Sequence, residues 1–268
     1  MCRGRFDRQR VRPEDPDRDL PLTVPARPGA SPNPEQDAVA FYPDEIVHAG
    51  AEHLDPDVVA AYDAKQRYDP TADVAALVDR GLGPSSVLLD MGCGTGTFTL
   101  AAAPLCSRVV AVDVSQPMLD RLVERAVERD LDNIEPVRAG FLSYVHQGAP
   151  ADVVFTRNVL HQLPDFWKGV ALSRLAGSTA PGGLLWLKDL EYAFEPSEAD
   201  EVLRAWFAAA AADPATGYTA ADLATHVRTE HSTFSWLLEP LLDHAGFRVI
   251  DTQVDPRRTY VRYACLKR

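Results

Sequence analysis

Cysteine is scarce in this chain, and the four cysteines that are present form no recognisable pattern. Neither a C-x-x-C pair nor a zinc-type cysteine and histidine spacing connects Cys2, Cys93, Cys106 and Cys265. This argues against a disulfide framework and against a zinc site. We therefore expect a reducing, cytoplasmic environment and no bound metal.

Long apolar runs and an excess of basic residues are also missing. No stretch approaches the roughly 18 apolar residues of a membrane span, and the N-terminus lacks the apolar core of a secretory signal. The 27 basic and 39 acidic residues give a formal net charge of −12. This charge disfavours broad binding to nucleic acid or to anionic membranes. The composition favours a small-molecule or protein substrate.

What the chain does contain is an apolar run that leads into a glycine-rich turn, V-L-L-D-M-G-C-G-T-G-T-F at residues 87–98. The first residues are typical of a strand buried on both faces. Three glycines then let the backbone turn sharply and approach a ligand closely. Backbone amides at the start of the following helix can face that ligand.

Two acidic residues accompany this turn. A dinucleotide-binding turn has the spacing G-x-G-x-x-G, whereas this one is G-x-G-x-G with Asp90 two residues before Gly92. A carboxylate there repels a pyrophosphate and attracts a ligand that carries an ammonium and a sulfonium. A second buried run ends at Asp113, 113 − 92 = 21 residues after Gly92, near the interval of about 20 residues for a ribose-binding acid.

The form D-x-G-x-G-x-G resembles motif I of the class I S-adenosylmethionine-dependent methyltransferases. The segment T-R-N-V-L-H-Q-L-P-D at residues 156–165 is similar to motif IV of their ubiquinone-biosynthesis-like, type 11 branch. It lacks the N-P-P-[YF] signature of enzymes that methylate nucleic-acid amino groups. A catechol-type metal site is poorly matched, because Asn158 follows Arg157 rather than an acid.

The resemblance implies an α/β fold, a Rossmann-like doubly wound sheet of seven strands, mostly parallel, with an antiparallel hairpin at its end. We expect the strands near residues 87–91, 109–113, 134–139, 152–156, 184–190, 247–254 and 259–266, with a turn at 181–183. We expect helices near residues 73–81, 115–128, 199–212 and 220–227, and another that opens at 231–236.

The chain should divide into a leader and one methyltransferase domain. Residues 1–40 are rich in proline and arginine and are expected to be disordered. The domain covers 41–268, with a helical cap at 41–70 and a helical insertion at 191–230 after the fifth strand. We interpret the insertion as a lid, and the alternative is a homodimerisation element.

The resemblance also implies the cofactor, S-adenosyl-L-methionine, and its contacts. Where similar enzymes often have Gly-Asp after the third strand, this chain has Gly140 and Phe141, and the aromatic ring offers a stacking surface for adenine instead. The predicted cofactor-binding residues are Tyr62, Tyr68, Asp90, Gly92, Cys93, Gly94, Gly96, Thr97, Asp113, Val114, Met118, Gly140, Phe141, Arg157 and Asn158.

Methyl transfer is an in-line displacement, so the protein must align donor and acceptor more than supply reactive groups. A general base is optional, and His161 and His231 are the candidates, with ordinary structural roles as the alternative. We expect His231, Thr233, Phe234 and Trp236 to contribute to the acceptor pocket. The alternative for the two aromatic residues is that they only pack the insertion against the core.

The sequence leaves two other classes of function open. A non-catalytic S-adenosylmethionine-binding protein would use the same glycine-rich turn. A nicotinamide-dependent oxidoreductase would need the third glycine one position later and a substrate domain.

Overall fold

The computed structural model describes residues 41–48, 54–55, 59, 66 and 68–268. The expected leader and Tyr62 lie outside the described residues, as does much of the expected cap. The chain divides into two compact units, Met1–Phe41 and Tyr42–Arg268. The elements described below belong to the second unit.

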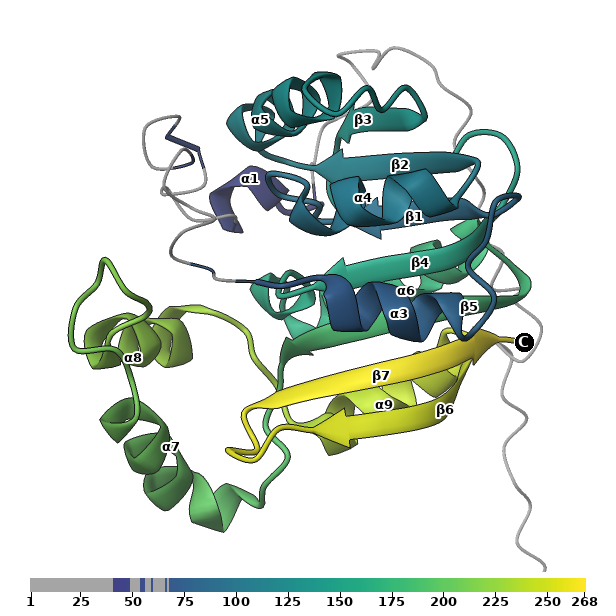
Figure 1. Ribbon diagram of the computed structural model, residues 1–268. Helices are drawn as coiled ribbons and strands as arrows, with labels where there is room; N and C mark the ends of the chain where they lie inside the picture. Colours follow the sequence, from purple (N-terminus) through teal and green to yellow (C-terminus); the bar gives the residue numbers. More distant parts are fainter. Residues whose placement is uncertain (1–40, 49–53, 56–58, 60–65, 67) are drawn as a thin grey trace, which may run out of the picture. The chain divides into compact units, whose positions relative to one another are not determined.

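In the described part of the chain, seven strands form one sheet with the order β3-β2-β1-β4-β5-β7-β6 (Figure 1). Neighbouring strands from β3 to β5 are parallel, and β7 runs antiparallel to both β5 and β6. This confirms the predicted doubly wound sheet with its terminal hairpin. The strands are β1 (Val87–Met91), β2 (Arg108–Asp113), β3 (Ile134–Arg138), β4 (Ala151–Arg157), β5 (Thr179–Leu190), β6 (Phe247–Val254) and β7 (Tyr260–Lys267).

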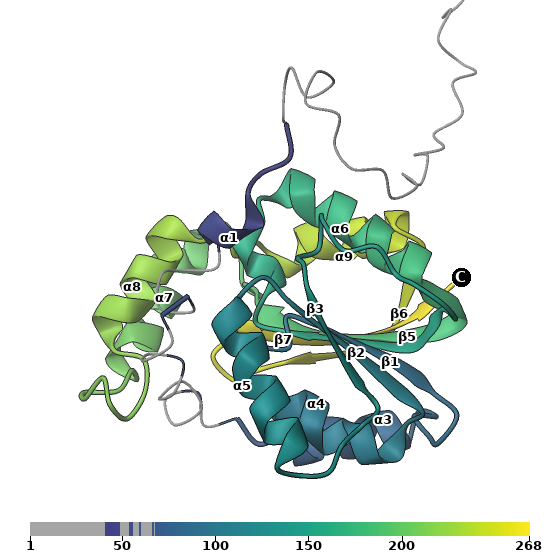
Figure 2. The ribbon, with the colours of Figure 1, turned by 90° about the horizontal axis from the view of Figure 1, so that it is seen from above.

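Helices cover both faces of the sheet (Figure 2). One face carries α3 (Thr71–Val78), α4 (Thr97–Ala102) and α5 (Gln116–Val127), and the other carries α6 (Asp165–Ser178) and α9 (Ser235–His244). Neighbouring residues of β1 therefore enter different cores. Leu88 packs with the α3 and α4 side, and Leu89 packs with the α6 and α9 side. Burial on both faces explains why β1 reads as a continuous apolar run.

The turn between β1 and α4 depends on glycine. Gly92 has φ 76°, and a Cβ added there would lie 2.2 Å from Cγ2 of Val159. Gly96 has φ 81°, and its added Cβ would lie 2.1 Å from Cδ1 of Leu122. Both the left-handed backbone and the close neighbours exclude larger residues.

The helix α6 has no counterpart among the helices expected from the sequence. Two local expectations differ from the structure. The expected turn at 181–183 lies inside β5, which begins at Thr179 and pairs with β4 through a shift of register between Ala151 and Val153. Residues 231–234 do not open a helix, because Phe234 has extended backbone angles and bridges to Tyr192, so α9 begins at Ser235.

The predicted helical insertion is present after β5. It contains a short 3-10 helix, η4 (Pro196–Glu198), followed by α7 (Ala199–Ala208) and α8 (Ala220–Thr229). Both α-helices lie beyond the carboxyl ends of the parallel strands (Figure 1). A separate apolar cluster fastens them to the domain, made by Leu190, Tyr192, Phe194, Val202, Trp206 and Leu223. Among the described residues, no helix is long and apolar enough to cross a membrane.

Candidate functional site

Two adjoining cavities open around the glycine-rich turn. The first has a volume of about 710 Å³ and the second about 830 Å³, and both are lined by Gly92, Gly94 and Arg157. Most predicted cofactor-binding residues line one or both of them. These are Tyr68, Asp90, Gly92, Cys93, Gly94, Thr97, Asp113, Val114, Met118, Gly140, Phe141, Arg157 and Asn158. The described lining does not include Gly96, which instead packs against α5.

Asp113, at the carboxyl end of β2, organises the turn in front of the first cavity. Its Oδ2 accepts the Gly94 N–H at 2.8 Å, and its Oδ1 accepts the Ser115 N–H at 2.9 Å. The N–H groups of Gly92 and Cys93 donate to the Val112 carbonyl at 2.8 and 3.0 Å. A carboxylate at this position in the cavity lining is a hydrogen-bond acceptor of the kind that ligand hydroxyls require.

Asp90, at the end of β1, is a buried acid beside the second cavity. It is 2% exposed, and the Thr99 hydroxyl donates to its Oδ2. Burial raises the pKa of Asp90 to about 7. The hydrogen bond from Thr99 lowers this pKa, and the negative charge of Asp113 raises it by a smaller amount. A cationic group of a ligand would therefore be stabilised here.

Arg157, at the end of β4, is held between the two cavities by an aromatic ring. Its guanidinium lies 4.0 Å from the ring centroid of Tyr68, whose hydroxyl donates to Asp73 Oδ2 at 2.7 Å. The indole of Trp186 donates to the other Asp73 oxygen at 3.0 Å. Among the described residues, the buried Nε of Arg157 and Oδ1 of Asn158 have no hydrogen-bond partner. These two atoms are available to a ligand.

Glu45, on α1 (Glu45–His48), places its carboxylate beside Gly140. Similar enzymes often have an aspartate after this glycine, where this chain has Phe141. Its Oε1 accepts the Leu142 N–H at 3.0 Å, and its Oε2 accepts the N–H and hydroxyl of Ser143 at 3.1 and 3.0 Å. A Cβ added to Gly140 would lie 2.4 Å from the Glu45 carboxyl carbon. Phe141 lines the first cavity but is only 4% exposed, within the core.

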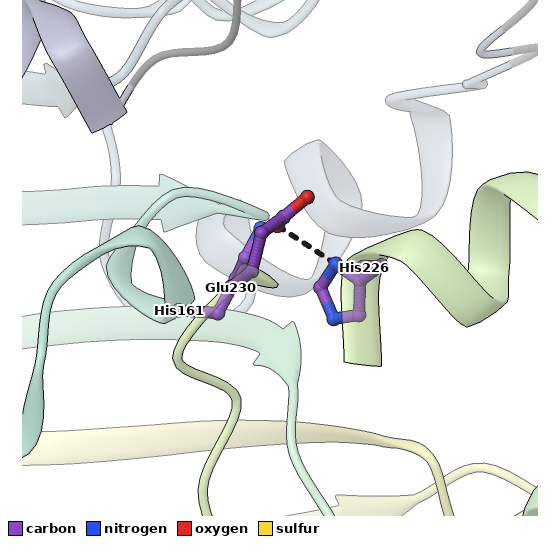
Figure 3. A group of neighbouring side chains, drawn as sticks. All are labelled: His161, His226 and Glu230. Carbon is purple, nitrogen blue, oxygen red and sulfur yellow. Dashed lines mark ion pairs between the residues drawn. The ribbon is translucent and has the colours of Figure 1, made fainter. Parts of the chain in front are cut away.

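His161 lies on η3 (Leu160–Gln162), next to Gln162 of the first cavity. Its Nδ1 contacts Asp189 Oδ1, and its Nε2 contacts Glu230 Oε2 at 2.8 Å. Nδ1 of His226 contacts the same Glu230 oxygen at 2.7 Å (Figure 3). Burial lowers the pKa of His161, but the carboxylates of Asp189 and Glu230 outweigh it and raise the pKa to about 9.

The four residues predicted for the acceptor pocket lie on the extended segment before α9 and at its start. The His231 N–H donates to the His161 carbonyl at 2.8 Å, and the Thr233 hydroxyl donates to Asp165 Oδ2 at 3.2 Å. Phe234 packs against the apolar cluster that fastens α7 and α8, and Trp236 stacks on Phe234 while remaining 50% exposed. The described residues that line the two cavities include none of these four.

Sequence reasoning missed part of the cavity lining. Val159, Gln162 and Leu163 follow the predicted Asn158, so extension of the motif IV segment would have found them. Arg125 lies on α5 and reaches back to the Thr95 carbonyl at 2.9 Å. Neither Arg125 nor Glu45 carries a local sequence signal, because each reaches the site from a distant helix.

Comparison with known proteins gives one family for this domain. A family profile described as "Methyltransferase domain" matches residues 88–183. The cypemycin N-terminal methyltransferase of Streptomyces sp. is 34% identical over 137 residues, which are 50% of this chain and 54% of that protein. The carboxy-S-adenosyl-L-methionine synthase of Hydrogenovibrio crunogenus is 32% identical over 180 residues, 63% of this chain and 69% of that protein.

A similar fold occurs in the magnesium protoporphyrin IX methyltransferase from Synechocystis, solved with bound S-adenosylmethionine. The TM-score is 0.52 at 19% sequence identity, over 74% of this chain and 78% of that one. This likeness concerns the fold alone. The chain spans about half the length of the cypemycin enzyme, at 54%.

Proposed function

The chain belongs to the class I S-adenosylmethionine-dependent methyltransferases, type 11/25 branch, and from this premise we propose that it methylates a small-molecule acceptor. The observation that carries the proposal is the pair Asp90 and Asp113. These carboxylates come from neighbouring strand ends and line the two cavities on either side of the glycine-rich turn. S-adenosylmethionine carries an ammonium, a sulfonium and two ribose hydroxyls, which match such a pair.

The residues present fit this cofactor. Asp113 would accept the ribose hydroxyls, and Asp90 would face the ammonium of the methionine part. The partnerless Nε of Arg157 suits a carboxylate, which this cofactor also carries. Val114 and Met118 offer an apolar wall for the adenosine. When bound, the cofactor supplies a methyl carbon activated by the positive sulfur.

The contribution of the chain is mainly alignment. Binding both reactants in one orientation can supply about 7 to 11 kcal/mol of the barrier reduction without a reactive side chain. This favours a mechanism in which a base is optional. His161 stays a proposed base, but its ring is 6% exposed and its pKa is raised to about 9, so it would first have to lose the Nε2 proton and separate from Glu230. His231 stays the second candidate.

The acceptor is proposed to be a small molecule rather than a nucleic acid. The net charge of −12 supports this. The relatives differ in activity, since one is a cypemycin N-terminal methyltransferase and another is a carboxy-S-adenosyl-L-methionine synthase. The segment 231–236 and the insertion remain the proposed source of acceptor specificity.

The deciding experiment has two stages. Isothermal titration with S-adenosylmethionine, and with NADH as the competing cofactor, tests the donor site. Incubation of cell extract with labelled S-adenosylmethionine, followed by mass spectrometry, tests transfer through a product heavier by one CH2 group. Binding of NADH alone would overturn the family-based function. Tight cofactor binding with no labelled product from any extract would favour the non-catalytic alternative.

We also propose a reducing, cytoplasmic location. Cys93, Cys106 and Cys265 are buried free thiols, which supports this. Homodimerisation through α7 and α8 is the alternative use of the insertion. Size-exclusion chromatography with light scattering tests it, and a monomer at high protein concentration would exclude it.

A further inference from the structure

The strongest unexplained feature outside the two cavities is a cluster of two histidines and a glutamate. His161 comes from η3, His226 from α8, and Glu230 from the residue after α8. One possible ligand atom from each lies within 4.8 Å of the others. Figure 3 shows the three side chains close together, His161 from η3 and the other two from the end of α8.

The contacts converge on a single carboxylate oxygen. Oε2 of Glu230 lies 2.8 Å from Nε2 of His161 and 2.7 Å from Nδ1 of His226. In a tetrahedral site with bonds of about 2.0 to 2.2 Å, such donor atoms lie roughly 3.3 to 3.5 Å apart. Each of the two imidazole nitrogens therefore needs to move only about 0.5 to 0.8 Å farther from this oxygen to admit an ion.

The remote nitrogen of each imidazole is already held by a polar partner. Nδ1 of His161 contacts the carboxylate of Asp189, which also accepts the His161 backbone N–H at 3.1 Å. Nε2 of His226 contacts the Ser232 hydroxyl at 2.8 Å. Metal-binding histidines adopt this arrangement, because the outer hydrogen bond fixes the tautomer and aims the other nitrogen at the ion.

Burial and charge also suit a cation. His161 and His226 are 6% and 9% exposed, and Asp189 is 2% exposed. The edge of the Trp206 indole packs against the His226 ring. Two carboxylates, buried Asp189 and Glu230 at 35% exposure, thus share the site with two buried imidazoles. A divalent ion would balance both negative charges.

We propose that His161, His226 and Glu230 bind one divalent transition-metal ion, with zinc as the reference ion, and that this ion fastens α8 to the end of β4. Two imidazole nitrogens and one carboxylate oxygen suit zinc, iron or nickel and are a poor set for magnesium or calcium. Three protein ligands leave at least one position open to water or to another ligand. The proposal does not depend on methyl transfer.

Without a metal, the same contacts form a hydrogen-bonded network. Both rings contact Oε2 of Glu230 in this network. Metal binding would replace these two contacts by bonds from the same three atoms to the ion.

The test uses tag-free, full-length protein treated with a chelator and then titrated with Zn²⁺ by calorimetry. We expect one equivalent to bind with a Kd of about 1 μM or tighter. His226→Ala and Glu230→Gln should each weaken binding at least 100-fold. Asp189→Asn, which removes only the outer partner, should weaken it about 10- to 100-fold. Titration with Co²⁺ should give visible absorption bands in the wild type that Glu230→Gln lacks.

His244→Ala and Glu128→Gln are matched controls, since they make the same changes at exposed positions, and both should bind Zn²⁺ as the wild type does. The proposal is overturned if the wild type shows no saturable Zn²⁺ or Co²⁺ binding, or if folded His226→Ala and Glu230→Gln bind as tightly as the wild type. S-adenosylmethionine affinity, measured in the same samples, reports separately on the proposed function.

Discussion

Asp113→Asn is the substitution that tests the donor site most directly. The carboxylate accepts two backbone N–H groups, from Gly94 and Ser115, at 2.8 and 2.9 Å, and is proposed to accept the ribose hydroxyls as well. An asparagine has nearly the same shape but one acceptor oxygen and no charge. The variant therefore separates the loss of charged acceptors from the loss of volume.

The expected loss follows from these bonds. Hydrogen bonds to a charged group contribute about 1.5 to 3 kcal/mol, so the affinity for S-adenosylmethionine should fall roughly 10- to 150-fold at about 1.4 kcal/mol per tenfold change. One of the two backbone bonds is also lost, at a cost of about 0.5 to 1.5 kcal/mol in the free energy of unfolding. This corresponds to a fall in Tm of roughly 1 to 6 °C.

Isothermal titration gives the affinity, and thermal unfolding without ligand gives the stability. Asp132→Asn is the matched control, because it makes the same change at an exposed loop position, and it should leave both quantities unchanged. If Asp113→Asn stays folded and its affinity is within about threefold of the wild type, Asp113 does not hold the ribose. A large fall in Tm with normal affinity would assign it a structural role only.

Three further predictions concern the turn, a buried acid and the acceptor segment. Gly92→Ala should lower the free energy of unfolding by about 1 to 3 kcal/mol, because its Cβ would lie 2.2 Å from Val159 Cγ2. In urea unfolding, the double variant with Val159→Ala should recover part of this loss. A single variant as stable as the wild type would refute the clash. Burial raises the pKa of Asp90 from 3.8 to about 7, so the folded state keeps a proton that the unfolded state loses. Asp90→Asn should therefore gain stability over the wild type as pH rises from 4 to 7, by about 4 kcal/mol at most, and a difference independent of pH would contradict this. Phe234→Ala should lower the free energy of unfolding by about 1 to 3 kcal/mol, because Phe234 packs against the apolar cluster that fastens α7 and α8. Trp236→Ala should lower it by about 0.5 kcal/mol or less, because this side chain is 50% exposed. Equal losses in the two variants would show that the packing is misjudged.

The sequence by itself determined the sheet and the glycine-rich turn with its two acidic residues. The runs that end at Asp90 and Asp113 are buried on both faces, so each is continuously apolar and easy to recognise. The glycines between them are required by local backbone angles, which leave a direct trace in the sequence. The predicted site residues around this turn therefore line the cavities in the structure.

Local signals failed where tertiary pairing opposed them. Pro181, Gly182 and Gly183 normally mark a turn, but the pairing of Thr179 with Ala151 and of Leu184 with Val153 places them within β5, as an irregularity between the two pairs. Residues 231–234 read as a helix start, but the backbone bonds of Tyr192 to this segment keep it extended. In both places the contact partner is far away in the sequence, and no window of neighbouring residues contains it.

Only the tertiary structure decided which distant side chains meet. Glu45 contacts the turn at Gly140 although the two residues are 140 − 45 = 95 positions apart in the sequence. His161 and His226 are 226 − 161 = 65 residues apart, and the absence of a short metal-binding motif led the sequence analysis to expect no metal. They come together because β5 carries the chain back to the edge where β4 ends, and α8 then folds over that edge. Such a meeting depends on the path of the backbone, which the spacing of residues along the chain does not record.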